Sequence, residues 1–232
     1  EASMAHSFVT HTFSECVENH AGMETVGEKR EEGLSNETLR QAHARIDGSE
    51  IVELGGVGAD EACVLVVRGG VNKLLKDEGG ADKLLAESLA QPLDTTFLNT
   101  RRKVVQNKHG RHNNCYADNA QAPDIANGKG TIVAFDAAPV MSEIRSAIPE
   151  MLGDDAKGLF AETNFYPDVT KRVVGIGFHG DTERRVVIGL RLGHAGTPLR
   201  FRWYTQNAPV GEEFVIELNH GDLYVMSDKA TG

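Results

Sequence analysis

The sequence has little of three things that would point to particular protein classes: cysteine, long apolar runs and net positive charge. Its three cysteines stand far apart without a C-x-x-C pair, which argues against both a disulfide framework and a zinc–cysteine site. No apolar run is long enough to cross a bilayer, and the first residues have neither the basic start nor the apolar stretch of a signal peptide. We therefore expect an intracellular protein, of the cytoplasm or nucleus, that does not enter a membrane.

Acidic residues dominate the charge. The formal net charge is −10, from 24 basic and 34 acidic residues. A field of this sign repels nucleic acid, so any binding of nucleic acid would need a local basic patch. With 232 residues, 40% of them hydrophobic, the chain can form one large domain or a catalytic domain with a smaller N-terminal layer.

The first part of the chain, residues 1–95, is expected to form a mixed α/β extension whose role the sequence does not indicate. A helix is predicted from the candidate N-caps at 35–36 toward residue 46. The apolar run 62–67, ended by two glycines, suits a buried strand. Helical spacing over 73–89 is interrupted by a pair of glycines.

From about residue 130 the pattern favours strands. A strand is predicted at 131–135, and Pro139 opens an amphipathic helix that reaches Leu152 with a bend at Pro149. Alternating apolar and polar residues predict short strands at 186–192, 199–204, 214–218 and 223–226, the last two joined by a hairpin turn at 219–221. We expect an α+β fold with a jelly-roll, or double-stranded β-helix, core and flanking helices.

Two residues, His179 and Asp181, form a pattern that indicates metal chemistry. If they lie in a strand, side chains two apart point to the same face about 6–7 Å apart, so both can reach one cation. Gly175 and Gly177 would leave space beside that cation. Two histidines and a carboxylate on one face of an octahedron are the ligands of non-haem Fe(II) oxygenases. The intervening apolar residues are expected to point into packing: Val174, Ile176 and Phe178.

Four segments occur in a particular order. They are Asn164-Phe165-Tyr166-Pro167-Asp168, His179-Gly180-Asp181-Thr182-Glu183, the run 187–193 and the run 220–226. In order and spacing they resemble the AlkB family of Fe(II)- and 2-oxoglutarate-dependent dioxygenases. The likeness covers roughly residues 100 to 232, and we expect an AlkB-like core at 96–232. The resemblance implies that His179 and Asp181 bind Fe(II), and that Asn164 and Tyr166 hydrogen-bond 2-oxoglutarate.

Two further residues of the family pattern would lie after Met226. They are a distal histidine, which is the third iron ligand, and an arginine that pairs with the far carboxylate of 2-oxoglutarate. We expect both beyond Gly232, so that the core lacks its C-terminal end in this sequence. His220 is interpreted as a turn residue rather than that ligand. Arg191 and Arg202 are alternatives for the carboxylate-binding arginine, although salt bridges explain them as well.

A local basic stretch interrupts the acidic chain. Five basic residues lie between positions 101 and 111, and no acid follows until Asp118. Such a stretch can hold phosphates or an acidic partner, and a solvated charged loop is the equal alternative. It also resembles the substrate-recognition lid of AlkB relatives that act on nucleic acid. That resemblance implies a substrate-binding set of Arg101, Arg102, Lys108, Arg111 and Tyr116.

The function implied by the resemblance is oxidative demethylation or hydroxylation with dioxygen and 2-oxoglutarate, the preferred substrate being an alkylated nucleobase in DNA or RNA. Two alternatives stay open. The first is a hydroxylase of a protein side chain or small molecule, which the net charge of −10 favours. The second is a non-catalytic jelly-roll binding module, which follows if the distal histidine and arginine are absent.

Overall fold

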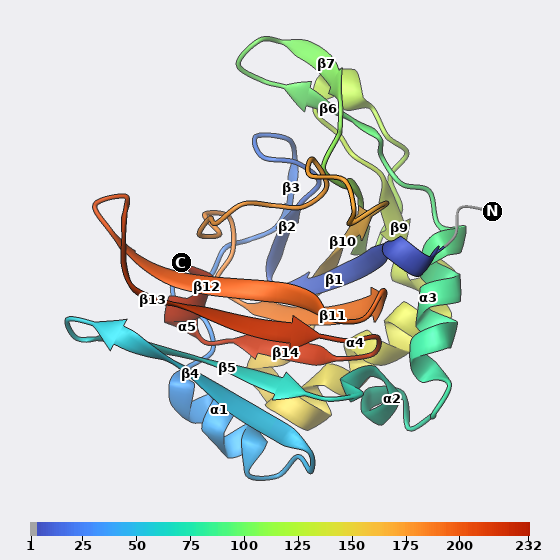
Figure 1. Cartoon of the computed structure of the whole chain (residues 1–232). Helices are drawn as coiled ribbons and strands as arrows, with labels where there is room; N and C mark the ends of the chain where they lie inside the picture. The colour runs from blue at the N-terminus through green and yellow to red at the C-terminus, as the bar shows by residue number, and fades with distance from the viewer. Residues whose placement is uncertain (1–3) are drawn as a thin grey trace.

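An eight-stranded sheet organises the fold (Figure 1). The computed structural model of the protein describes residues 4–232. Within that range the neighbouring strands of the sheet pair antiparallel, except for the parallel pair β8 and β9. In spatial order the strands are β4 (Ser49–Val57), β5 (Asp60–Val67), β14 (Leu223–Met226), β11 (Val187–Gly193), β1 (Phe8–Ser14), β10 (Phe160–Tyr166), β8 (His112–Ala117) and β9 (Ile132–Ala134).

The strand nearest the start of the chain lies in the middle of this sheet. β1 pairs with β10 along its whole length, from Phe8 opposite Tyr166 to Ser14 opposite Phe160, and its other edge pairs with β11. β4 and β5 also precede residue 95, and β5 pairs with β14. The described chain therefore builds one sheet across the boundary expected at residue 95, and that boundary does not separate two sheets.

Helices cover one face of the sheet (Figure 1). The helix α4 has the predicted proline at its first turn, continues through Pro149, and buries Met141, Ile144 and Ile148. In α1 the hydroxyl oxygen of Ser35 accepts a hydrogen bond from the backbone N–H of Thr38 at 3.0 Å, which confirms the predicted N-cap. The helices on this face are α1 (Asn36–His43), α2 (Gly70–Leu75), α3 (Gly80–Ala90) and α4 (Pro139–Leu152).

Shorter helical segments connect the larger elements. The last of them, α5 (Asp228–Thr231), lies at the C-terminal end of the chain. No helix in the described part of the chain is long and apolar enough to cross a membrane. The 3₁₀ segments are η1 (Met4–His6), η2 (Ile125–Asn127), η3 (Phe135–Ala137) and η4 (Asp154–Ala156).

A long hairpin covers part of the opposite face. Its strands, β12 (Thr197–Thr205) and β13 (Ala208–Leu218), pack apolar side chains against β4, β5, β11 and β14. The indole N–H of Trp203 donates to the backbone carbonyl of Leu54 at 2.7 Å. The predicted hairpin turn at 219–221 is wrong, because β13 pairs with β12 while β14 pairs with β11 and β5. That turn carries the chain from the hairpin back into the large sheet.

Two small ladders complete the strand content of the described residues. One consists of β2 (Cys16–Glu18) and β3 (Thr25–Gly27). The other consists of β6 (Thr96–Asn99) and β7 (Val104–Asn107), and it projects away from the large sheet (Figure 1). The chain is thus an α+β protein dominated by β-structure, with helices on one face of its main sheet and the β12–β13 hairpin on part of the other.

A histidine is fully buried where the sheet meets the helices. The ring nitrogens of His11 lie 2.7 Å from Oγ of Ser88 in α3 and 3.0 Å from Oγ1 of Thr163 in β10. Burial lowers the pKa of His11 from 6.5 to about 3, because a charged imidazole would lose its hydration there. The histidine is therefore neutral in the native protein.

We predict that His11 makes the protein less stable in acid. Its folded pKa lies below its unfolded pKa, so its contribution is present above about pH 6.5 and is lost as the pH falls toward about 3. At pH 5 the loss amounts to about 2 kcal/mol. Urea unfolding at pH 7 and pH 5 measures it, and H11Q should remove that part of the pH dependence. The exposed control H109Q should keep it; equal pH dependence in H11Q and the native protein would contradict the prediction.

Candidate functional site

The pair His179 and Asp181 lies in a loop between β10 and β11, not in the predicted strand. The strand prediction is wrong because β10 and β11 each have β1 on one edge and another strand on the other, which leaves no free edge beside them. The apolar residues between also do not pack inward as predicted: Ile176 and Phe178 are 50% and 47% exposed. The loop runs over the face of the sheet that the helices do not cover (Figure 1).

The loop nevertheless brings the two side chains together. Nε2 of His179 lies 3.3 Å from Oδ1 of Asp181, and Nδ1 of His179 contacts the backbone carbonyl of Gly177 at 2.7 Å. The hydrogen bond to Asp181 raises the pKa of His179. Burial acts to raise the pKa of Asp181, but the hydrogen bond from His179 and the charge of Arg184 outweigh it and lower that pKa. A half-exposed imidazole and an ionised carboxylate therefore face each other.

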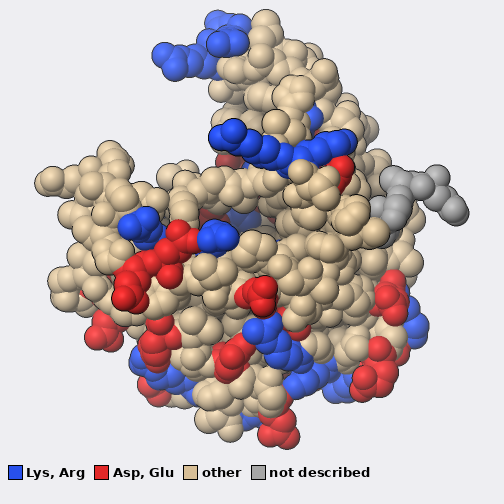
Figure 2. Space-filling model, in the orientation of Figure 1, with Lys and Arg blue, Asp and Glu red and all other residues tan. Residues whose placement is uncertain are grey.

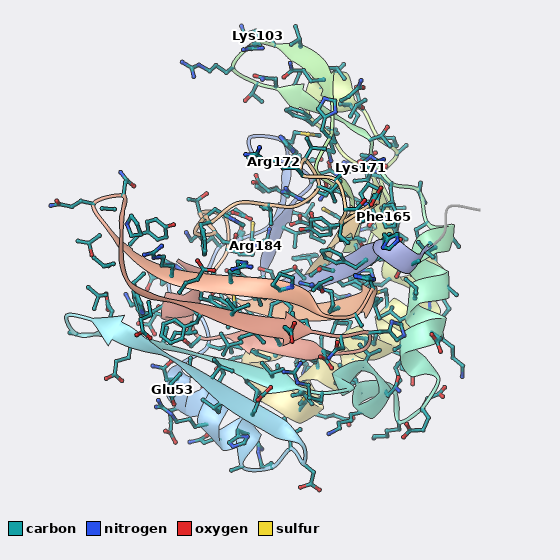
Figure 3. All side chains as sticks on the ribbon, viewed as in Figure 1. Glu53, Lys103, Phe165, Lys171, Arg172 and Arg184 are labelled. Carbon is teal, nitrogen blue, oxygen red and sulfur yellow. The ribbon has the colours of Figure 1, made fainter. Side chains whose placement is uncertain are left out.

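A buried arginine connects this pair to the sheet. Arg184 lies on the side of the sheet away from the helices (Figure 3), and its side chain is 6% exposed. Its Nε lies 3.4 Å from Oδ2 of Asp181, and its terminal nitrogen lies 2.6 Å from Oε2 of Glu162 and also contacts Glu183. Burial acts to lower the pKa of Arg184, and the three carboxylates overcome it and raise that pKa. The guanidinium is a fully paired buried cation.

The network continues along β10. Oε1 of Glu162 accepts a hydrogen bond from the side-chain amide of Asn164 at 2.9 Å. The amide oxygen of Asn164 in turn accepts from Nε of Arg111 at 2.6 Å and from the amide of Asn113. Positive charge on Arg111 also lies close enough to affect the pKa values of His179 and Asp181. Asn164, Arg111 and the His179–Asp181 pair therefore belong to one network of polar contacts.

Lys108 supports this site from within and is not on its surface. Its side chain is 8% exposed, and its ammonium donates to Oδ1 of Asn19 at 2.6 Å and to Oδ1 of Asn113 at 3.0 Å. Burial lowers the pKa of Lys108 to about 8. The structure thus does not place Lys108 where a substrate would touch it, and it gives the residue a role in orienting Asn113.

Tyr166 lies on the same face of the sheet, farther along β10. Its ring stacks on Phe8 with centroids 4.3 Å apart, and the guanidinium carbon of Arg191 lies 4.4 Å from the centroid of the same Phe8 ring. Burial raises the pKa of Tyr166 to about 12. Phe8 comes from β1, the strand between β10 and β11, so it joins Tyr166 to Arg191.

Three of the predicted residues lie elsewhere. Tyr116 is fully buried on the helix-covered face, against Phe135 and His11, because it is opposite Ala161 in the register of β8 and β10. Side chains alternate between the two faces along β8. Tyr116, three residues after Asn113, therefore lies on the face opposite to the one that Asn113 shares with Asn164. Arg101 and Arg102 are exposed in the turn at the tip of the β6–β7 ladder, well outside the network.

The residues that the sequence offered as alternatives, His220, Arg191 and Arg202, lie in different parts of the structure. His220 lies in the turn between β13 and β14, where its Nδ1 accepts a hydrogen bond from the backbone N–H of Gly193 at 2.9 Å and its Nε2 lies 3.2 Å from Asp82. Arg202 is exposed on β12, whereas Arg191 is 4% exposed. Of these two arginines, Arg191 is the one that lies on the same face of the large sheet as the buried polar network.

The polar network contains residues that the sequence did not single out: Glu162, Arg184 and Asn113. Glu162 and Asn164 are two apart in β10, so the same alternation that was applied to Asn164 and Tyr166 would have included Glu162. No local pattern marks Arg184, because its partners are distant in the sequence. Within residues 4–232 no group of three or more histidine, cysteine, aspartate or glutamate side chains is arranged to hold a metal ion. Among the described residues, His179 and Asp181 are thus two neighbouring side chains of types that can bind a metal ion.

We predict that R184M lowers the free energy of unfolding by about 3–5 kcal/mol, because Glu162 would stay buried without its cation. Urea unfolding at pH 7 measures the change. The control R200M removes the exposed pair with Glu213 and should cost only about 0–1 kcal/mol. The double variant R184M/E162Q should recover part of the loss. An R184M cost no larger than that of R200M would show that the buried pair does not stabilise the fold.

No protein-family model and no solved structure matches the chain. A curated protein does: Uncharacterized protein R156 of Acanthamoeba polyphaga mimivirus is 35% identical over 235 residues, which cover 97% of this chain and 88% of the viral protein. Identity at this level over nearly the whole chain means that the elements of the sheet and the site loop are both within the shared region. The chain belongs to the same family as this mimivirus protein.

Proposed function

We propose that the protein is an AlkB-like, Fe(II)- and 2-oxoglutarate-dependent dioxygenase that demethylates or hydroxylates its substrate. The observation that carries the proposal is the His179–Asp181 pair, with donor atoms 3.3 Å apart, joined through Arg184 and Glu162 to Asn164. An imidazole and a carboxylate that face each other are the ligand types that non-haem iron prefers. Asn164 and Tyr166 lie on the same face of β10, and in this proposal they hydrogen-bond 2-oxoglutarate.

The arrangement of the strands supports a double-stranded β-helix core. The β12–β13 hairpin faces the large sheet across an apolar layer, and the site loop lies over the same face beside it. A jelly roll consists of two such facing sheets with its ligand between them. In this proposal the large sheet is one wall, and the hairpin together with the loop at 173–181 is the other.

The residues fit an iron ion in part. His179 and Asp181 supply two donors, and the described residues do not complete a set of three. When bound, iron and 2-oxoglutarate would supply the oxidation of a C–H bond by dioxygen. The chain's own contribution is to orient the pair. Arg184 holds the carboxylate of Asp181, and the carbonyl of Gly177 fixes the imidazole ring of His179.

We predict that the full-length protein converts 2-oxoglutarate to succinate only when Fe(II) is added. H179A and D181A should each lower this turnover by at least about 100-fold, because each removes a metal ligand. Succinate formation measured by mass spectrometry tests this. The control D168N, at the partly buried start of the same loop, should keep the activity. No succinate with any metal, or full activity in H179A, would rule out the proposed reaction.

Basic side chains frame a hollow on this face of the molecule (Figure 2). Lys103 lies at the tip of the projecting β6–β7 ladder, and Lys171 and Arg172 lie in the site loop below it (Figure 3). Arg101 and Arg102 are in the same turn as Lys103. These five cations support nucleic acid as the substrate, because they would hold its backbone while a base enters the site unstacked. The net charge of −10 favours the second candidate, a protein or small-molecule substrate.

We predict that R101E/R102E/K103E weakens binding to a methylated single-stranded oligonucleotide and lowers the slope of log K against log salt by roughly 2–3. Fluorescence anisotropy over a salt series measures both. The control R45E/K73E/K76E makes the same change in net charge on the helix side of the molecule and should leave binding nearly unchanged. Equal loss in both variants, or no binding by the native protein, would favour the protein or small-molecule substrate.

A further inference from the structure

A cleft opens between helices on the face of the molecule away from the site loop (Figure 1). It is bounded by the turn that follows α1, by α2 and by α4, and its volume is about 340 Å³. Sites for small molecules commonly occupy about 300–1,000 Å³ and often lie between packed helices. We call it the helix-side cleft, and none of the residues of the His179–Asp181 network lines it.

The floor of the helix-side cleft is aliphatic. Four side chains form it: Ile46, Leu74, Ala147 and Met151. Leu74 is 6% exposed and belongs to the apolar core, and the other three are partly buried and pack against that core. No aromatic ring and no hydrogen-bonding side chain is among these four. The floor therefore fits an aliphatic chain better than a planar polar ring, which is bound by stacking and hydrogen bonds.

The rim of the helix-side cleft carries more positive than negative charge. Its cations are Arg45, Lys73 and Lys76, and its acids are Asp47 and Glu150. The ammonium of Lys76 lies 3.5 Å from the carboxylate of Glu150, and both side chains are largely exposed. An exposed pair of this kind is weak, so it leaves the lysine able to turn toward a ligand. The rim thus has a net positive charge in a protein whose overall charge is −10.

Two of these cations have no acidic partner. Lys73 donates to the backbone carbonyl of Asp47, and Nε of Arg45 donates to the backbone carbonyl of Gln41 at 3.2 Å. Within residues 4–232 no ion pair joins either cation to a carboxylate, and the terminal nitrogens of Arg45 make no hydrogen bond. Those nitrogens and the ammonium of Lys73 can therefore donate to an anion that enters the cleft.

The size of the apolar area favours a small ligand over a protein partner. A stable protein interface buries roughly 800 Å² on each partner. The aliphatic floor, in contrast, consists of four side chains within one cleft of about 340 Å³. An aliphatic floor beneath a cationic rim matches a molecule that has both an apolar chain and an anionic head.

We propose that the helix-side cleft binds an aliphatic carboxylic acid of roughly eight to ten carbons. The chain of the acid lies on the floor, and its carboxylate accepts hydrogen bonds from Arg45 and Lys73 at the rim. The cleft and the loop that bears His179 and Asp181 are on opposite faces of the molecule (Figure 1). This site is therefore independent of the proposed oxygenase function.

The test follows the methyl group of Met151 by NMR in full-length protein with carbon-13-labelled methionine methyl groups. Its resonance is the one missing from the spectrum of M151L. Decanoate, added below its micelle concentration, should shift this resonance to saturation. It should bind at least about tenfold more tightly than butyrate, which has the same head and a short chain. Decyltrimethylammonium has the same long chain and a positive head, so it should bind at least about fivefold more weakly than decanoate.

Variants of the rim and of the floor test the two parts of the site separately. R45Q/K73Q should weaken decanoate binding at least about fivefold, because it removes the donors to the carboxylate. The control R200Q/K229Q removes the same charge from exposed positions on β12 and α5 and should bind decanoate as the native protein does. A147L keeps the three cations and fills part of the floor, so it should weaken decanoate by about threefold or more. It tests the site even if R45Q/K73Q does not fold.

Three outcomes would overturn the proposal. The first is equal affinity for decanoate and decyltrimethylammonium, or no saturable shift of Met151 with decanoate. The second is native decanoate affinity in both A147L and folded R45Q/K73Q. The third is tighter binding of an acetylated hexapeptide with two leucines between pairs of glutamates, which would make the cleft a site for an acidic protein segment.

Discussion

The central position of β1 is the constraint on which the rest of the structure depends. Both edges of this strand are hydrogen-bonded, one to β10 and the other to β11. Its alternate residues therefore decide what stands on each face. Val9 and Phe13 extend the apolar core toward the helices, while Phe8 and Thr10 bridge the polar residues of β10 to those of β11. Without β1, Asn164 and Arg191 would lie on separate strands with no common surface.

Ion pairs around Arg184 fix the positions of the side chains on the polar face of the sheet. The guanidinium of Arg184 contacts three carboxylates, those of Glu162, Glu183 and Asp181. Asp181 in turn contacts His179, and Glu162 accepts a hydrogen bond from Asn164. Because the surroundings have a low dielectric constant, each of these contacts is strong when both partners are present, and a buried charge that loses its partner is costly. The network thus fixes the loop that bears the His179–Asp181 pair, although that loop has no strand partner of its own.

The two buried arginines, Arg184 and Arg191, differ in their neighbours. Arg191 lies one strand away from the complete network and has hydroxyl groups and an aromatic ring as neighbours instead of acids. The outer surface has the reverse pattern, with basic side chains at the tip of the β6–β7 ladder of an otherwise acidic protein. Among the described residues, the interior thus contains one buried arginine without an acidic side chain paired to it, and the exposed turn 101–103 contains three basic side chains.

The sequence by itself determined the local elements. The apolar run of β5, the proline-initiated α4, the cap of α1 and the alternation in β12 each depend on neighbours a few residues away, and each formed as predicted. The proximity of His179 and Asp181 is local too. Tertiary structure alone decided the loop at 173–181, the burial of Lys108 and Tyr116, and the place of β1. These depend on which strand edges are already paired and on register between distant segments, and neither is encoded within a short stretch of chain.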